Sequence, residues 1–128
     1  MTMPVRAPAA PSSRDWTRQP PMILLWWGLP IAVGMLANAP RLSQRADAGV
    51  WAVAMGWMAT GCLLNARRCH RVHCFISSPV LLLGALFAAL SALGAIEPSA
   101  GMFGNIVNGA LLLALLSFAP EIVWRRYV

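Results

Sequence analysis

The sequence has little charge, no lysine and few acidic residues. Charged residues make up 11% of its 128 residues, which is less than half of the roughly 25% found in soluble domains. Hydrophobic residues make up 59%, and the mean hydropathy is +0.64. A chain this short cannot bury so much apolar surface in a single water-facing core. The composition therefore argues against a soluble enzyme, an extracellular disulfide scaffold and a disordered chain, and it predicts an integral membrane protein.

Residues able to carry hydrolysis or acid–base catalysis are also scarce. The four acidic residues are Asp15, Asp47, Glu97 and Glu121, and none lies clearly in the middle of an apolar segment. The sequence has no phosphate-binding loop, no GxSxG motif and no HExxH motif. Its three cysteines are an odd number and define no disulfide framework. We therefore do not expect an enzyme.

Four apolar segments are each close to the ~20 residues that a helix needs to cross a bilayer. They predict an all-α, polytopic membrane protein with four transmembrane helices. The expected organisation is a disordered cytoplasmic tail over residues 1–21 and a four-helix transmembrane domain over residues 22–128, with helices at about 22–39, 49–74, 79–96 and 105–124. Ser78 and Pro79 have the residue types of the cap and first turn of the third helix.

Small residues suggest how these helices pack. Two ridges favour close approach between helices, within the chain or with a partner: Ala52-x3-Gly56-x3-Thr60 and Gly84-x3-Ala88-x3-Ala92. An alternative interpretation concerns the first segment, because residues 37–39 resemble a signal-peptide cleavage site. Cleavage there would leave three helices and the same orientation.

The arginines predict that orientation. All ten cationic residues are arginines, and with four crossings eight of them share one side of the membrane with both termini. The positive-inside rule makes this side cytoplasmic. We therefore expect a multi-pass protein of the bacterial inner (plasma) membrane with both termini in the cytoplasm. The pI near 11.1 reflects these helix-end arginines, so no nucleic-acid partner is expected.

One short stretch concentrates the residues that could bind a ligand. Residues 67–74 read Arg-Arg-Cys-His-Arg-Val-His-Cys and lie at the cytoplasmic end of the second segment. If the helix continues through this stretch, the four thiol and imidazole groups share one face, at about 0° for Cys69, 40° for His73, 100° for His70 and 140° for Cys74. Cys62 then lies two turns deeper on that face.

Thiolate and imidazole ligands suit Zn, Cu and, by the same softness argument, Hg ions. Neighbouring arginines favour the thiolate form that binds metal. We expect Cys69 and Cys74 to be the primary metal ligands, with His73 as the third, His70 as a further candidate and Cys62 as a transfer position within the membrane. A simpler interpretation is that Arg67, Arg68 and Arg71 are topology anchors that contact anionic lipid.

The same stretch carries a resemblance. Residues 61–69, followed by Arg71, His73, Cys74 and Pro79, resemble a set of small, uncharacterised prokaryotic membrane proteins that carry N-A-R-R-C-G-R-x-H-C, then Gly-Pro, and Pro-Glu near the C-terminus. Pro120 and Glu121 match the last element, whereas His70 and Ser78 replace glycines of the pattern. A looser likeness links the chain to mercuric-ion transport membrane proteins, although it lacks their vicinal cysteine pair. The resemblance implies the same membrane topology, and it directs attention to the cysteines and histidines of this stretch.

Three functions therefore stay open. The leading hypothesis is a small inner-membrane protein that binds a thiol-seeking metal ion for transport, hand-off or sensing. The alternative is a non-catalytic accessory subunit of a larger membrane complex, packed on a membrane-protein partner or a second copy through its small residues. Thiol redox chemistry is the third, and it is disfavoured because the thiols would face the reducing cytoplasm and Cys-x4-Cys is not the usual redox pair.

Overall fold

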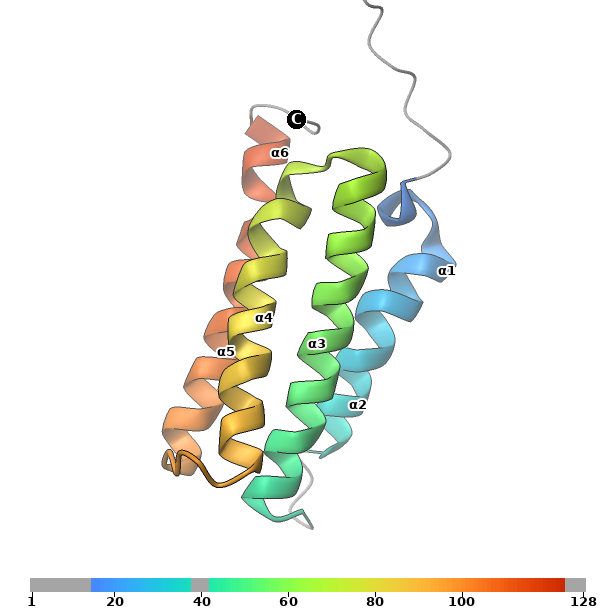
Figure 1. Ribbon diagram of the computed structural model, residues 1–128. Helices are drawn as coiled ribbons and strands as arrows, with labels where there is room; N and C mark the ends of the chain where they lie inside the picture. Colours follow the sequence, from blue (N-terminus) through green and yellow to red (C-terminus); the bar gives the residue numbers. More distant parts are fainter. Residues whose placement is uncertain (1–14, 38–41, 124–128) are drawn as a thin grey trace, which may run out of the picture.

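The computed structural model describes residues 15–37 and 42–123, and every regular element in those ranges is a helix. The elements are η1 (Trp16–Arg18), α1 (Pro20–Ile23), η2 (Leu24–Gly28), α2 (Leu29–Ala37), α3 (Gln44–Cys69), α4 (Val72–Ala92), α5 (Ala100–Leu116) and α6 (Ala119–Val123). Figure 1 shows α3, α4 and α5 side by side, with α2 against α3. The predicted all-helical fold is confirmed.

Three helices in the described part of the chain are long and apolar enough to cross a membrane. They are Pro20–Ala37, which joins α1, η2 and α2, then Gln44–Arg68 within α3, and Val72–Ala92. The fourth apolar helix, α5, has 17 residues and a length of about 26 Å, against ~30 Å of hydrocarbon. The helices expected at 22–39, 49–74, 79–96 and 105–124 all begin and end earlier in the chain than predicted.

The first long helix contains a wide turn immediately before Pro30. Proline cannot donate a backbone hydrogen bond, and its ring clashes with the carbonyl four residues earlier. The π-helical turn η2 relieves this, because the N–H of Leu29 bonds to the carbonyl of Leu24 instead of that of Leu25. The indole Nε1 of Trp57 donates to the Leu25 carbonyl at 3.3 Å. The π-turn therefore makes a polar contact with α3.

The two halves of this helix meet α3 through different glycines. A β-carbon at Gly61 of α3 would lie 2.6 Å from the Trp26 ring, and a β-carbon at Gly34 of α2 would lie 2.7 Å from the Trp51 ring. Each indole therefore lies directly on a glycine of the opposite helix. Glycine is needed at both positions because any side chain would displace the aromatic ring.

The N-terminal residues next to this helix correct one prediction. The disordered tail expected over residues 1–21 does not extend to residue 21, because Asp15 is buried and Trp16–Arg18 form a 3₁₀ turn. Residues 1–14 lie outside the described part of the chain. The proline-rich composition gave no sign that Asp15 has partners in α3 and in the turn between α3 and α4.

The start of α3 follows ordinary capping rules. The Ser43 hydroxyl accepts from the N–H of Ala46 at 3.3 Å, and Asp47 places a negative charge in the first turn. Nearby, an exposed ion pair of 2.8 Å joins Arg45 to Glu97. This ion pair ties the start of α3 to the loop between α4 and α5.

The turn between α3 and α4 differs most from the prediction. The second helix was expected to continue to Cys74, but α3 ends at Cys69 because His70 adopts a left-handed conformation with φ 52°. Its N–H bonds to the Ala66 carbonyl at 2.8 Å, as in a C-terminal helix cap. A new helix begins at Val72, so Pro79 lies inside α4 instead of at its start.

Small residues bring α4 close to α3 and α5. A β-carbon at Gly84 would lie 2.6 Å from the Met55 sulfur and 3.3 Å from the β-carbon of Ala110. Ala88 on the same ridge is fully buried. The glycine of the expected ridge on α3 makes no such close contact, since a β-carbon at Gly56 would meet nothing within 4 Å. Of the two predicted ridges, the one on α4 therefore packs within the chain.

Candidate functional site

The break at His70 turns the chain back on itself and brings two thiols together. Cys62 of α3 and Cys74 of α4 are each 1% exposed, and both line the same small void between the helices. The continuous helix expected from the sequence would have placed Cys74 on the face of Cys69, more than three turns beyond Cys62. The antiparallel turn instead pairs Cys74 with the deeper cysteine.

His73 completes this buried group. Its Nε2 lies 3.2 Å from the Cys74 sulfur, and its side chain is fully buried. The imidazole stacks on Phe118 with 4.0 Å between ring centroids and an interplanar angle of 20°. The His73 carbonyl accepts from the Ser77 hydroxyl at 2.6 Å. The ring is therefore held between the thiols and the segment that follows α5.

Two polar side chains contact the sulfurs. The Asn65 amide nitrogen donates to the Cys74 sulfur at 3.5 Å, and the Ser77 hydroxyl lies 3.6 Å from the Cys62 sulfur. The Ser77 hydroxyl has only one hydrogen, and this hydrogen forms the shorter bond, to the His73 carbonyl. The Ser77 oxygen can then accept a hydrogen bond from the Cys62 thiol. We call Cys62, Cys74 and His73 the thiol–imidazole cluster.

The structure separates His70 from this cluster. His70 is exposed and stacks on Phe75, 6.4 Å between ring centroids. Cys69 is the last residue of α3, but its side chain lies outside the described part of the structure. Among the described side chains, no three from His, Cys, Asp and Glu are grouped as the ligands of one metal ion. Because α3 ends at Cys69 and α4 begins at Val72, the four predicted ligands do not lie along one continuous helix, as the one-face arrangement required.

A charged network that the sequence did not predict lies next to the cluster. The Arg71 guanidinium donates to Asp15 Oδ2 at 2.8 Å, and Asn65 Nδ2 donates to Asp15 Oδ1 at 3.2 Å. The Asn65 carbonyl oxygen accepts from the N–H of Trp16 at 3.1 Å. One amide thus bonds both to the thiol of Cys74 and to the carboxylate of Asp15. The only signal in the sequence was the polarity of Asn65 within an apolar segment.

The arginines expected to face lipid divide into two groups. Arg71 turns inward to Asp15, and its side chain is 12% exposed. Arg67 and Arg68 are exposed, and the Arg68 guanidinium lies 4.8 Å from the centroid of the Trp16 ring. Trp16 stacks in turn on Trp26 at 5.4 Å. Aromatic rings and one cation therefore cover the cluster on its N-terminal side.

Beneath this cover lies a small void beside the thiols. It has a volume of about 20 Å³ and is lined by Trp16, Met22, Ile23, Trp26, Trp27, Gly61, Cys62, Asn65 and Cys74. This is the size of one water molecule or one metal ion. Cys62, Cys74 and Asn65 are among the residues that line the void, so residues with soft ligand groups and a hydrogen-bond donor surround it.

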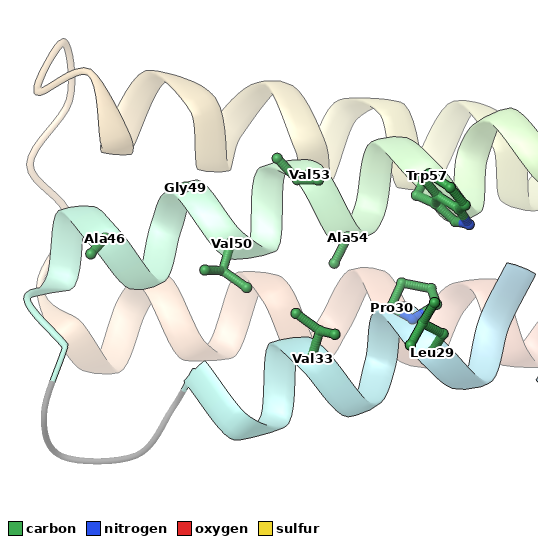
Figure 2. A pocket seen from close by; sticks show the side chains of 9 residues that line it. All are labelled: Leu29, Pro30, Val33, Ala46, Gly49, Val50, Val53, Ala54 and Trp57. Atoms are coloured by element: carbon green, nitrogen blue, oxygen red, sulfur yellow. The ribbon is translucent and has the colours of Figure 1, made fainter. Parts of the chain in front are cut away.

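A larger hollow lies elsewhere, between α2 and α3. Its volume is about 490 Å³, and Figure 2 shows Leu29, Pro30 and Val33 of α2 facing side chains of α3 that include Val50 and Ala54. Nearly all of the atoms that line this groove are apolar. It therefore offers surface for hydrocarbon and no set of polar ligand groups.

Comparisons with protein-family models, with curated proteins and with solved structures found no match to this chain.

Proposed function

We propose that this chain is a small integral membrane protein that binds a thiol-seeking metal ion at the thiol–imidazole cluster, for transport, hand-off or sensing. The observation that carries the proposal is that the buried Cys62 of α3 and Cys74 of α4 line one small void, with His73 Nε2 3.2 Å from the Cys74 sulfur. Two thiols on facing helices have an imidazole beside them. They are a usual donor set for soft metal ions.

The donor set favours some metals over others. Structural zinc requires four ligands in a tetrahedron, and the described side chains offer no group of even three. Monovalent copper and divalent mercury accept two thiolates, with a third ligand optional. The void of about 20 Å³ next to Cys62 and Cys74 has room for such an ion. Binding would form two metal–sulfur bonds and release the thiol protons.

The polar neighbours would hold the ligands in place. Asn65 donates to the Cys74 sulfur and Ser77 lies beside the Cys62 sulfur. Groups that hydrogen-bond to metal ligands fix the orientation of those ligands and tune their affinity. Asn65 also links Cys74 to the Asp15–Arg71 ion pair, so the site would respond to the position of the N-terminal segment.

We place the site at the cytoplasmic end of a four-helix bundle in the bacterial inner membrane, with α5 as the fourth crossing. In support, η1, the turn between α3 and α4, and α6 all lie at one end of the bundle (Figure 1). That end carries Arg18, Arg67, Arg68 and Arg71, and arginines mark the cytoplasmic side. Arg67 and Arg68 would contact anionic lipid there.

Metal binding by the purified protein tests the proposal. The protein in mild detergent would be loaded with Cu(I) or Hg(II), freed of excess ion and assayed by elemental analysis and thiolate–metal absorbance. We expect about one equivalent in the native protein and in Cys69→Ser, and none in Cys62→Ser/Cys74→Ser. Undiminished binding in the double variant would overturn the proposal. Loss of binding in Cys69→Ser alone would instead indicate that the metal site lies in the turn between α3 and α4, as expected from the sequence.

A second candidate function is that of an accessory subunit in a larger membrane complex. The observation that favours it is the apolar groove of about 490 Å³ between α2 and α3, which a partner helix could fill (Figure 2). Purification from native membranes in mild detergent distinguishes the two. Stable recovery of a larger complex, unchanged when Cys62 and Cys74 are replaced by serine, would favour the subunit role.

A further inference from the structure

Two amide side chains point away from the bundle in the middle of α5. Asn105 and Asn108 are exposed, and neither side chain makes a hydrogen bond within the part of the chain that the structure describes. At 1.5 Å per residue they lie about 8 Å and 12 Å from the start of a helix about 26 Å long. The proposed crossing of the membrane by α5 would therefore place both amides at the depth of the lipid chains.

The opposite side of α5 explains why the amides face outward. Phe103, Val107 and Ala114 are the buried residues of α5, and α5 makes its main contacts with α4. At 100° per residue, Asn105 and Asn108 lie on the far side of the helix from these three. Rotating α5 to bury the amides would expose its packing face, so no small adjustment within one chain removes them from lipid.

An exposed amide is costly in hydrocarbon. Water is absent there, so an unpaired N–H or C=O group loses its hydrogen bonds without replacement. Polar side chains in membrane helices are therefore usually paired across a helix interface. Two such side chains on one lipid-facing surface indicate that another helix covers them.

Glycines beside the amides leave room for that helix. A β-carbon added at Gly101, Gly104 or Gly109 would meet nothing within 4 Å. Gly101 precedes Asn105 by four residues and Gly104 precedes Asn108 by four, the spacing of small residues at close helix–helix contacts in membranes. Gly101, Asn105, Asn108 and Leu112 fall within an arc of about 60°. We call these four residues the amide face.

We infer that the amide face of α5 pairs two copies of this chain. A carboxamide carries both donor and acceptor, so the same amide from two copies related by a two-fold axis can exchange hydrogen bonds. The helix Ala100–Leu116 has no charged residue, and nothing on this face complements a charged partner. A second copy supplies the required donors and acceptors at matching positions. The inference rests on the proposed membrane crossing by α5 and is independent of metal binding.

Subunit counting in lipid bilayers tests the pairing. Fluorescently labelled protein would be diluted in phosphatidylcholine liposomes, and dimers would be counted by two-step photobleaching. We expect dimers in the native protein and a dissociation constant weakened by about tenfold or more in Asn105→Leu/Asn108→Leu. Leucine dissolves better in lipid than asparagine, so this variant should keep its fold, which circular dichroism checks.

Cysteine cross-linking identifies the surface with a matched control. Leu112 and Leu113 are neighbours of almost equal exposure, 57% and 56%, but Leu113 lies about 100° away from the amide face. In a Cys69→Ser background, with Cys62 and Cys74 buried, a short bismaleimide should join chains carrying Leu112→Cys and not those carrying Leu113→Cys.

In these two tests, three results would overturn the pairing. They are a monomeric native protein at every dilution, dimers unaffected by Asn105→Leu/Asn108→Leu, and equal cross-linking at positions 112 and 113. A native monomer that still binds one metal ion at Cys62 and Cys74 would reject the dimer and leave the proposed function intact. Exclusive recovery of a complex with a different protein bound to α5 would also reject a second copy as the occupant.

Discussion

Arg71 donates to Asp15 across 2.8 Å, although 56 residues separate them in the chain. Asp15 is fully buried and Arg71 nearly so, so this ion pair fastens the N-terminal segment onto the turn between α3 and α4. Because Asn65 bonds to both Asp15 and Cys74, this ion pair is connected to the Cys74 thiol through the Asn65 side chain.

Asp15→Ala should destabilise the fold and open the thiols to solvent. Loss of one partner from a buried ion pair costs about 3 kcal/mol, and the Asn65 amide loses an acceptor as well. We expect easier unfolding in SDS, followed by circular dichroism, and faster maleimide labelling of Cys74 in a Cys69→Ser background. The matched control is Glu97→Ala, which removes a salt bridge of equal length between exposed side chains and should cost at most about 1 kcal/mol. Equal effects in the two variants would contradict a special role for Asp15.

His70→Gly should stabilise the protein by about 1 kcal/mol. The left-handed conformation at His70 is strained for a residue with a β-carbon and unstrained for glycine. The control is His70→Ala, which also removes the ring that stacks on Phe75 but keeps the β-carbon, so it should bring no such gain. Resistance to SDS unfolding measures both. A gain in both variants would show that the ring, and not the backbone, is responsible.

His73→Gln should weaken metal binding without abolishing it. The imidazole lies beside Cys74, whereas both thiols remain in this variant. We expect affinity for Cu(I), measured by competition with a chelator, to fall by about 10–100-fold, the range found when groups that support a metal centre are removed. His70→Gln, on the exposed side of the turn, should leave affinity unchanged. Equal losses in the two variants would instead support the one-face ligand set expected from the sequence.

Gly84→Val should loosen the packing of α4. Its first side-chain carbon would lie 2.6 Å from the Met55 sulfur and 3.3 Å from Ala110, and overpacking of this kind costs about 1–3 kcal/mol. Gly56→Ala is the control, because nothing lies within 4 Å of a β-carbon there and alanine favours helix over glycine by up to about 1 kcal/mol. Opposite shifts in SDS unfolding are expected. A neutral Gly84→Val would show that α4 can move away from α3.

The sequence predicted the helical class, the apolar segments and the region of the cluster, because hydropathy and unusual residue types are local signals. Two features of the structure could not be read from local sequence. Ser78 and Pro79 have the pattern of a helix start, but the Ser78 hydroxyl bonds to the Ala59 carbonyl of α3 at 3.4 Å and so serves helix packing. The end of α3 depends on a left-handed histidine, a conformation that side-chain type does not predict. Because that break was not predicted, the proximity of Cys62 and Cys74 was not predicted either.

The wide turn at Leu24–Gly28 also has a geometric consequence. A π-turn accommodates one extra residue, which shifts the helical phase of everything after it by about 100°. Trp26 within the turn and Gly34 after it therefore meet α3 in two different registers, with Trp26 on Gly61 and Gly34 on Trp51. A regular α-helix with the same ends could keep only one of these contacts. Deletion of a single residue between positions 24 and 28 would therefore uncover the thiols or separate α2 from Trp51, even though the hydrophobicity of the helix would hardly change.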